Sequence, residues 1–345
     1  MKKVNVAIVG ATGMVGRTFL KILQERNFPI ENLYLLASKK SAGDVVNFNG
    51  KDYIIEELTE HSFDKDIDIA LFSAGGEISK KFAPIAKEKG AIVVDNSSMW
   101  RMYDDVPLVV PEVNPEDVKK HNGIIANPNC STIQAVVPLK SLHSKFGIKR
   151  IVYSTYQAVS GSGVKGIADL KEGVKGNESK LYPHPIAYNC LPHIDTFLDN
   201  GYTKEEMKMI DETKKILNDH TIKITATTVR VPVMYAHSES VNIEFEKEFD
   251  VKDIFDVLST TDGIVVVDDP KNNQYPLALD VEGKDEVFVG RIRRDFSLDN
   301  GINMWVVADN IRKGAATNTV QIAELLLKYN LVCGKKLYSD LVFIL

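Results

Sequence analysis

Three glycines near the start of the chain separate a short apolar segment from an amphipathic one. Residues 4–9 (VNVAIV) have the composition of a buried strand, and residues 13–26 carry apolar side chains at helical spacing. The segment that joins them, residues 10–16, reads GATGMVG. Glycines let a backbone approach a pyrophosphate closely, and the first turn of a helix offers it free N–H donors. Because this pattern lies between a strand and a helix, it predicts a dinucleotide-binding loop.

Strand-like and helix-like segments continue to alternate over the first third of the chain. Apolar segments at 33–37, 68–72 and 92–94 are expected strands, and residues 78–89 have the pattern of a helix. Alternation of this kind predicts a doubly wound parallel sheet with helices on both faces, which is the Rossmann-type α/β architecture.

After the first third, the strand-like segments become longer and alternate apolar with polar residues, as in residues 241–249. Such alternation indicates a sheet with one polar or interfacial face. We therefore expect a Rossmann-type domain at residues 1–128 and an α+β domain with a mixed sheet at residues 129–313. A helix near 314–330 could pack on either domain. The other expected elements are helices at 131–144 and 204–217 and strands at 151–158, 222–231, 287–293 and 302–308.

The loop after the second expected strand bears on the choice of nicotinamide cofactor. An NAD enzyme typically places Asp or Glu there, on the ribose hydroxyls. This chain instead has Ser38, Lys39, Lys40 and Ser41. Hydroxyls and lysines suit a 2′-phosphate, so the sequence predicts NADP over NAD. The residues expected to bind the cofactor in this domain are Gly10, Thr12, Gly13, Met14, Val15, Ser38, Lys39, Ser41 and Ser73.

Composition argues against several other classes of protein. The 345 residues carry a net charge of −5 and no block of like charge, so no nucleic-acid partner is expected. No segment approaches the roughly 20 consecutive apolar residues of a membrane helix. His184, Cys190 and His193 lack the spacing of zinc ligands, so no metal is expected.

The chain has three cysteines, Cys130, Cys190 and Cys333, too few and too scattered for a disulfide framework. This usage fits a reducing, cytoplasmic location. Cys190 and Cys333 are expected to be small, buried apolar residues. Cys130 differs, because Pro128 disfavours helix before it and an apolar-periodic helix follows. A helix N-terminus stabilises a thiolate, the reactive form of cysteine, so Cys130 is the candidate nucleophile.

Six groups of residues, in order along the chain, carry a resemblance to a known family. They read GATGMVG (10–16), DNSSMWR (95–101), PEVN (111–114), NPNCST (127–132), QAVSGSG (157–163) and RVPV with AHSE (230–233, 236–239). Over nearly its whole length the chain resembles the aspartate-semialdehyde dehydrogenase family. Six motifs in the same order are far more specific than any one of them.

The resemblance implies a reversible, NADPH-dependent reduction of 4-phospho-L-aspartate to L-aspartate 4-semialdehyde and phosphate. This reaction belongs to the biosynthesis of lysine, through diaminopimelate, and of threonine and methionine. Cys130 would attack the acyl carbon and expel phosphate, and hydride from NADPH would convert the thioester to a hemithioacetal, which collapses to the aldehyde. The family also implies a homodimer, with residues 129–313 as the catalytic and dimerisation domain; a tetramer stays open.

The matched motifs imply roles for polar residues around the cysteine. His237 would act as general acid/base at the hemithioacetal stage, since an imidazole titrates near neutrality. Gln157 would orient the acyl group. Arg230 would bind the α-carboxylate through its planar guanidinium.

Further positions would bind the rest of the substrate and the nicotinamide. Arg101 would bind the phosphate, with Lys208 and Asn129 assisting. Glu205 lies three residues before Lys208 on an expected helix and would meet the substrate ammonium, although the neighbouring Glu206 is an open alternative. The residues expected to border the nicotinamide are Ser160, Gly161 and Asn310.

Two other functions are compatible with parts of this pattern. Another acyl-phosphate reductase, such as N-acetyl-glutamyl-phosphate reductase, shares the architecture and a cysteine nucleophile. A catalytically inactive relative that serves as an interaction partner would have lost Cys130, Gln157 or His237, and all three are present.

Overall fold

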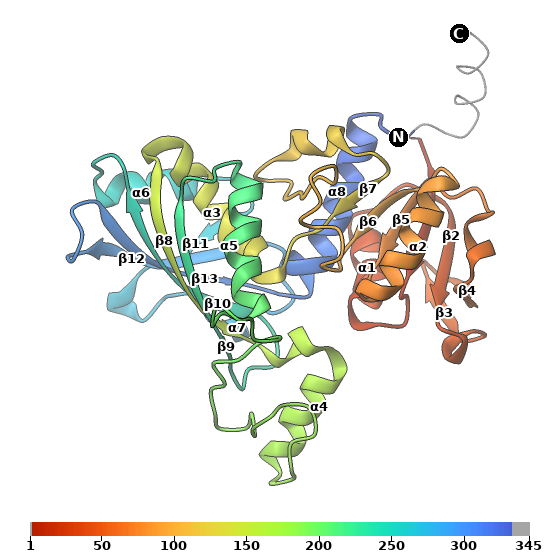
Figure 1. Cartoon of the computed structure of the whole chain (residues 1–345), viewed down its shortest axis with the longest axis horizontal. Coiled ribbons are helices and arrows are strands. Elements are labelled where there is room, and N and C mark those ends of the chain that lie inside the picture. The colour runs from red at the N-terminus through yellow and green to blue at the C-terminus, as the bar shows by residue number, and fades with distance from the viewer. Residues whose placement is uncertain (1, 333–345) are drawn as a thin grey trace. The chain divides into compact units, whose positions relative to one another are not determined.

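The computed structural model describes residues 2–332 of the chain. These residues divide into two units (Figure 1): residues 2–128 together with 315–332, and residues 129–314. Cys333, which the sequence assigns to the ordinary buried cysteines, lies outside the described residues. Between residues 2 and 332, no helix is long and apolar enough to cross a membrane.

The first unit is built on a sheet with the strand order β3-β4-β2-β1-β5-β6-β7. Neighbouring strands are parallel, except that β3 and β4 are antiparallel. The chain leaves β1 toward β2 on one side and later adds β5 on the other, so the strand order reverses at β1. The strands are β1 Val4–Val9, β2 Ile30–Ala37, β3 Val45–Phe48, β4 Lys51–Glu57, β5 Ile69–Phe72, β6 Ile92–Asp95 and β7 Ile124–Ala126.

Helices cover this sheet because its central strands have no polar face. Every residue of β5 and β6 is buried, as expected for parallel strands between two helical layers. Apolar side chains of the last helix belong to the same core as those of the first. The helices are α1 Met14–Glu25, α2 Gly76–Glu88 and α8 Thr317–Lys328, with short 3-10 turns η1 Lys39–Ser41, η2 Glu60–Phe63 and η3 Pro115–Lys120. The predicted doubly wound α/β fold is confirmed.

The second unit contains a mixed sheet in the order β11-β12-β13-β10-β8-β9 among the described residues. The outer pairs β11–β12 and β8–β9 are parallel and the inner pairs are antiparallel. The strands are β8 Ile148–Gln157, β9 Lys223–Arg230, β10 His237–Phe245, β11 Ile264–Val266, β12 Val287–Asp295 and β13 Gly301–Ala308. The predicted mixed sheet is thus confirmed.

One face of the mixed sheet is buried beneath helices α3 and α5. Along β10 the buried side chains alternate with partly exposed ones from Glu239 to Phe245, as the sequence pattern predicts. Figure 1 shows α4 and its following loop as a lobe that extends beyond this sheet. The helices are α3 Cys130–Phe146, α4 Gly163–Val174, α5 Lys204–Leu217, α6 Val251–Ser259 and α7 Ala278–Val281, with the turns η4 Val159–Ser162 and η5 Pro270–Asn272.

Some elements differ from the sequence-based expectation. The helix expected near 314–330 begins instead as a π-helical turn, η6 Arg312–Ala316, and becomes α-helical only at Thr317. The edge strand β3 and its neighbour β4 were not expected, because their side chains are mostly exposed and give little apolar signal. Helix α4 was not expected either, since three glycines lower its helix propensity.

Candidate functional site

The glycine loop of the first unit brings three segments of backbone into close contact. Gly10 follows β1 with a φ of +89°, and a Cβ there would lie 2.3 Å from the carbonyl oxygen of Ser73. A Cβ on Gly16 would lie 2.2 Å from the carbonyl oxygen of Gly10. Both positions therefore require glycine, and the loop keeps the tight turn that the sequence predicts.

The loop ends at a helix N-terminus with exposed donors. Gly13 is the N-cap of α1, and no side chain caps the helix or places an acidic group in its first turn. The amides of Met14 and Val15 thus begin a twelve-residue helix at the point where the strand order reverses. In open α/β sheets this point is where a dinucleotide pyrophosphate binds, so the observed cradle fits that group.

The carboxyl end of β2 presents the residues that the sequence assigns to a 2′-phosphate. Ser38 is the N-cap of η1, and the side chains of Ser38, Lys39 and Lys40 are exposed. Ser41 and Ser73 are partly buried at the same edge of the sheet, after parallel strands β2 and β5. The side chains of Lys39 and Lys40 have no ion-pair partner in the described part of the chain, so they give this edge a positive character.

Arg101 lies in the first unit and is only 7% exposed. Its Nε donates to the carbonyl oxygen of Asn127 at 2.9 Å, and its Nη2 donates to that of Asn96 at 2.8 Å. Both asparagines lie in motifs that carry the family resemblance, but neither was expected to be a site residue. Asn127 Nδ2 donates to Asn96 Oδ1 at 3.0 Å, and Asn318 Nδ2 donates to Asn127 Oδ1 at 2.7 Å. The guanidinium is therefore held by the ends of β6 and β7.

The second unit places Cys130 at the first residue of α3. The N-cap Asn129 accepts hydrogen bonds through Oδ1 from the amides of Ser131 and Thr132, at 3.0 and 3.4 Å. Cys130 is partly exposed. A Cβ on Gly314 would lie 2.8 Å from the Cβ of Cys130, so the π-helical turn packs its backbone directly against the cysteine. The predicted position at a helix start is confirmed.

Glu205 connects the cysteine loop to the sheet. Its Oε1 accepts from Asn129 Nδ2 at 2.9 Å and from Gln157 Nε2 at 3.4 Å, and its Oε2 pairs with Lys208 Nζ at 3.0 Å. Burial would raise the pKa of Glu205, but Lys208, Asn129 and Arg230 outweigh it and hold that pKa below its usual value. An ionised carboxylate thus contacts three other predicted site residues, Asn129, Gln157 and Lys208.

Glu206, the alternative to Glu205, has a different environment. Its Oε2 accepts from the amide of Thr203 at 2.8 Å, and its Oε1 accepts from the amide of Thr228 at 3.1 Å. It closes a capping box at the start of α5 and ties that helix to β9. Only Glu205 contacts other predicted site residues.

Three predicted site residues lie side by side on the buried face of the sheet. Gln157 pairs with Arg230 across β8 and β9, and His237 starts the neighbouring strand β10. Arg230 Nη1 donates to the carbonyl oxygen of Ala158 at 2.7 Å. A Cβ on Gly161 would lie 3.0 Å from Arg230 Nη1 and 3.5 Å from His237 Nε2, so this glycine keeps room above both side chains.

The hydrogen bond at His237 defines its tautomer. Its Nδ1 accepts from the amide of Ala158 at 3.0 Å, so in the neutral ring the proton is on Nε2. Nε2 is buried and has no hydrogen-bond partner among residues 2–332. Burial, together with the positive charge of Arg230, holds the pKa of His237 well below its usual value. The ring is therefore a neutral donor whose free N–H can stabilise an oxyanion.

Two of the three residues predicted to border the nicotinamide, Ser160 and Asn310, are in contact. Ser160 Oγ donates to Asn310 Oδ1 at 3.0 Å, and the amide of Ala236 donates to the same oxygen at 3.0 Å. Asn310 Nδ2 is buried and finds no acceptor in the described part of the chain. The side-chain amide is thus fixed with its donor unused.

Glu239 is a buried acid that the sequence analysis did not single out as a site residue. It lies two residues after His237 and opposite Thr155 of β8, is 0% exposed, and neither carboxylate oxygen has a hydrogen-bond partner among residues 2–332. Burial raises the pKa of Glu239 well above its usual value, and the charge of Glu205 raises it further. A carboxylic acid in such surroundings stays protonated.

This protonation predicts a pH-dependent effect of Glu239→Gln on stability. Above about pH 4.5 the unfolded chain loses the Glu239 proton while the folded chain keeps it, so wild-type stability decreases as pH rises. Glutamine has no such proton. The free energy of unfolding of the variant should therefore rise relative to that of the wild type, by up to about 1.4 kcal/mol for each unit increase in pH. Chemical denaturation between pH 5 and 8 measures this. Glu248→Gln, at an exposed position, should show no trend; a flat difference for Glu239→Gln would contradict the protonated form.

Two sequence-based expectations concern residues outside this site. Cys190 is exposed, so the expectation of a buried cysteine is wrong: it follows Tyr188 and Asn189 in a loop that packs little apolar surface around it. Among the described residues, no three His, Cys, Asp or Glu side chains come together as a metal site.

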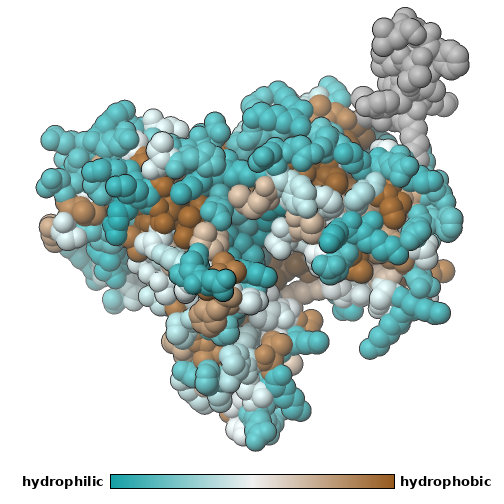
Figure 2. Space-filling model, in the orientation of Figure 1, coloured by the Kyte–Doolittle hydropathy of each residue, from teal (hydrophilic) through white to brown (hydrophobic). Residues whose placement is uncertain are grey.

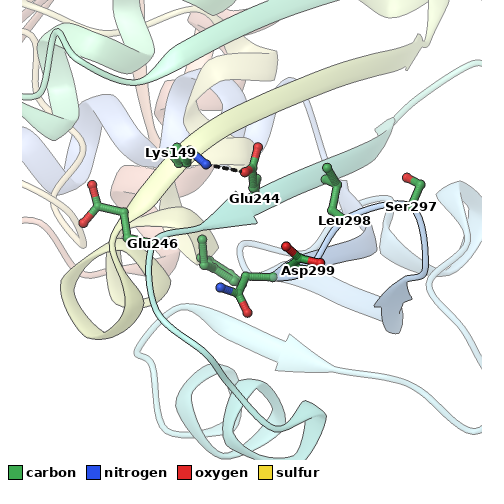
Figure 3. Close-up of a pocket in the computed structure, with 8 residues that line it drawn as sticks. Lys149, Glu244, Glu246, Ser297, Leu298 and Asp299 are labelled. Carbon is green, nitrogen blue, oxygen red and sulfur yellow. Dashed lines mark hydrogen bonds and ion pairs between the residues drawn. The ribbon is translucent and has the colours of Figure 1, made fainter.

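A surface pocket lies at the far end of the second unit's sheet (Figure 3). Lys149, Glu244, Glu246, Ser297, Leu298 and Asp299 line it, and Lys149 Nζ pairs with Glu244 Oε1 at 2.7 Å. Glu244 follows His237 by seven residues on β10, roughly 23 Å along a strand. The pocket is therefore separate from the site around Cys130.

Comparison with known proteins identifies both units. The family model described as "Semialdehyde dehydrogenase, NAD binding domain" matches residues 5–121, and "Semialdehyde dehydrogenase, dimerisation domain" matches residues 139–313. The chain is 59% identical over 337 residues to the aspartate-semialdehyde dehydrogenase of Aquifex aeolicus (strain VF5), which covers 95% of this chain and 99% of the relative.

Solved structures of related proteins agree. The crystal structure of aspartate semialdehyde dehydrogenase II from Vibrio cholerae, complexed with ASA, has a TM-score of 0.91 and 50% identity, covering 95% of this chain and 99% of that one. An aspartate semialdehyde dehydrogenase with NADP from Candida albicans has a TM-score of 0.77 and 27% identity, covering 96% and 100%. These relatives support the aspartate-pathway reductase and not N-acetyl-glutamyl-phosphate reductase. The chain belongs to the aspartate-semialdehyde dehydrogenase family.

Proposed function

We propose that the chain converts 4-phospho-L-aspartate to L-aspartate 4-semialdehyde and phosphate, reversibly, through a thioester on Cys130. The observation that carries this proposal is the group formed by Cys130 at a helix start, Gln157, His237 and Arg230, joined by the Glu205 carboxylate through Asn129 and Gln157. The first unit would bind the cofactor, and the second would carry out acyl transfer.

The proposed reaction has two stages, acyl transfer to Cys130 and reduction of the thioester. The Cys130 thiolate attacks the acyl carbon, a C–S bond forms, and the C–O bond to phosphate breaks with its electron pair leaving on phosphate. NADPH, when bound, supplies the hydride that reduces the thioester. The hemithioacetal oxyanion then expels the Cys130 thiolate and becomes the aldehyde. The His237 Nε2–H is the candidate donor to that oxyanion, and Gln157 is the candidate group that orients the acyl carbonyl.

Charged side chains would hold the two anionic ends and the ammonium of the substrate. Arg230 is buried, lies beside Gln157 and suits the α-carboxylate. Glu205 suits the ammonium because its carboxylate is ionised and faces the same group of residues. Lys208 and Asn129 are the proposed phosphate ligands of the second unit, and Arg101 keeps the phosphate-binding role that the sequence predicts for it.

NADP is the proposed cofactor. The Gly10 cradle and the N-terminus of α1 fit a pyrophosphate, and exposed Lys39 and Lys40 fit a 2′-phosphate. Lys39→Ala should raise the KM for NADP about 5- to 50-fold, because a charge-assisted contact is lost, and leave the KM for NAD within about twofold. Steady-state kinetics with both cofactors measures this. Lys51→Ala, exposed on β4, is the control and should change neither KM; equal turnover of wild type with both cofactors contradicts the proposal.

We also propose that the chain forms a homodimer and works in a reducing, cytoplasmic location. Figure 2 shows hydrophobic residues among hydrophilic ones on the lobe around α4. Exposed apolar residues gather there, as at protein interfaces: Val164, Val174, Leu181, Tyr188 and Phe197. A free thiol at Cys130 suits a reducing compartment, where lone cysteines stay reduced.

One experiment tests the reaction. Purified protein should oxidise L-aspartate 4-semialdehyde only when NADP and phosphate are both present, because phosphate releases the acyl group from Cys130. Oxidation without phosphate would indicate a hydrolytic aldehyde dehydrogenase, and activity on the N-acetyl-glutamyl substrate instead would indicate the related reductase.

A further inference from the structure

Lys208, the proposed phosphate ligand of the second unit, is held between two carboxylates. Its Nζ lies 2.8 Å from Asp195 Oδ2 and 3.0 Å from Glu205 Oε2. Burial would lower the pKa of Lys208, but the two carboxylates raise it above its usual value, so the side chain is an ammonium. Lys208 and these two carboxylates together carry a net charge of −1, while Lys204 acts on Asp195 and Arg230 acts on Glu205 without a hydrogen bond.

That charge balance opposes the binding of an anion. An ammonium has three N–H donors, and the two carboxylates occupy two of them. A phosphate approaching Lys208 would therefore meet two like charges within one or two hydrogen-bond lengths. Tight phosphate binding requires one carboxylate to move away.

Asp195 is the carboxylate that can move. The Glu205 side chain is 7% exposed and also bonded to Asn129 and Gln157, so its displacement would break the site. The Asp195 side chain is 32% exposed and lies in the loop before α5. Apart from the pair with Lys208, its carboxylate accepts hydrogen bonds, within residues 2–332, only from the adjacent Thr196, through Oδ1.

The backbone conformation at Asp195 also separates this residue from the buried Glu205. Its φ is +69°, in the left-handed region that non-glycine residues occupy at a cost. The carboxylate nevertheless reaches Lys208 on α5 from a surface loop. Asp195 is thus placed to contact the lysine without being part of the buried network.

We propose that Asp195 is an internal competitor for phosphate, which pairs with Lys208 when the phosphoryl group is absent and releases it when that group binds. The inference rests on the proposed phosphate-binding role of Lys208. Its consequence is weaker phosphate binding than a free lysine would give, which favours release of phosphate after acyl transfer.

Asp195→Asn tests the inference, because asparagine keeps the contact with Thr196 and removes the charge. In the oxidative reaction, the KM for inorganic phosphate should fall about two- to fivefold, the range expected for one partly exposed ion pair. The KM for aspartate semialdehyde should stay unchanged. In the reductive reaction, phosphate should become a stronger product inhibitor by the same factor.

A matched control is Asp199→Asn in the same loop. Asp199 is exposed and makes no ion pair with any described residue, so this change should leave the KM for phosphate as in wild type. An unchanged phosphate KM in Asp195→Asn overturns the competition. A higher KM also overturns it, because Asp195 would then orient Lys208 for phosphate.

Lys208→Met separates this inference from the proposed function. If Lys208 binds phosphate, Lys208→Met raises the KM for phosphate, and adding Asp195→Asn to it has no further effect. If Lys208→Met leaves that KM unchanged, both the role of Lys208 and the competition fail. A fall in KM caused by Asp195→Asn even without Lys208 would show a general charge effect and overturn only the competition.

Discussion

Cys130→Ala should lower kcat in both directions by about 10⁴-fold or more, because an alanine side chain cannot form the thioester. The N-cap Asn129 and the backbone of Gly314 would remain in place, since alanine is smaller than cysteine and keeps the Cβ that Gly314 contacts. Binding of the cofactor by the first unit should be unchanged. Single-turnover kinetics with 4-phospho-L-aspartate, followed by mass spectrometry, measures both the rate and the acyl-enzyme.

Cys190→Ala is the matched control for that experiment. Cys190 is exposed in a loop, so removal of its thiol should keep wild-type kcat and the same acyl-enzyme mass. Retained activity in Cys130→Ala would falsify the covalent mechanism. Acylation at another residue in the wild type would have the same consequence.

His237→Ala should lower kcat by about 10²- to 10³-fold, the usual effect of removing one donor to a developing oxyanion. His237→Gln should recover part of this loss, because a side-chain amide also donates a hydrogen bond but cannot take up a proton at neutral pH. The comparison therefore separates a hydrogen-bond donor from a general base. Steady-state kcat values for the two variants give the answer.

The pH profile provides a second measure of the same group. Because burial and Arg230 hold the pKa of His237 well below its usual value, the neutral ring persists as pH falls through about 6.5. Protonation of His237 should therefore not lower wild-type kcat near pH 6.5. The pH profiles of the wild type and His237→Gln should have the same shape there. A decrease there in the wild type alone, together with a glutamine variant as slow as the alanine variant, would support acid/base catalysis instead.

The first unit follows closely from its sequence. The glycine loop, the buried strands and the helix after them are local patterns, and each has one compatible backbone geometry. Gly10, for example, needs a positive φ and contact with Ser73, and no other residue fits both. The edge hairpin β3–β4 escaped prediction because exposed strands carry no continuous apolar signal.

The candidate nucleophile was also predictable, because its signals are local. Pro128 precedes it and an apolar-periodic helix follows, and α3 does begin at Cys130. The distinction between Glu205 and Glu206 was not predictable. These residues are adjacent on one helix and chemically identical, and only the strands that pack against α5 give them different partners.

The π-helical turn next to Cys130 was also not predictable from the sequence. Residues 312–316 have the composition of an ordinary helix, and the sequence predicts one near 314–330. The observed turn places Gly314 against Cys130, a contact between residues 184 positions apart. Local propensity carries no information about such a contact.

By itself, the sequence determined the order of strands and helices, the dinucleotide loop and the residue that starts α3, because these depend on near neighbours. Only the tertiary structure decided the tautomer of His237, the protonation of Glu239 and the pairing of Lys208 with Asp195. Each of those depends on burial and on charges brought together from distant segments. A pattern of residue types cannot specify them, since the electrostatic environment exists only after the chain has packed.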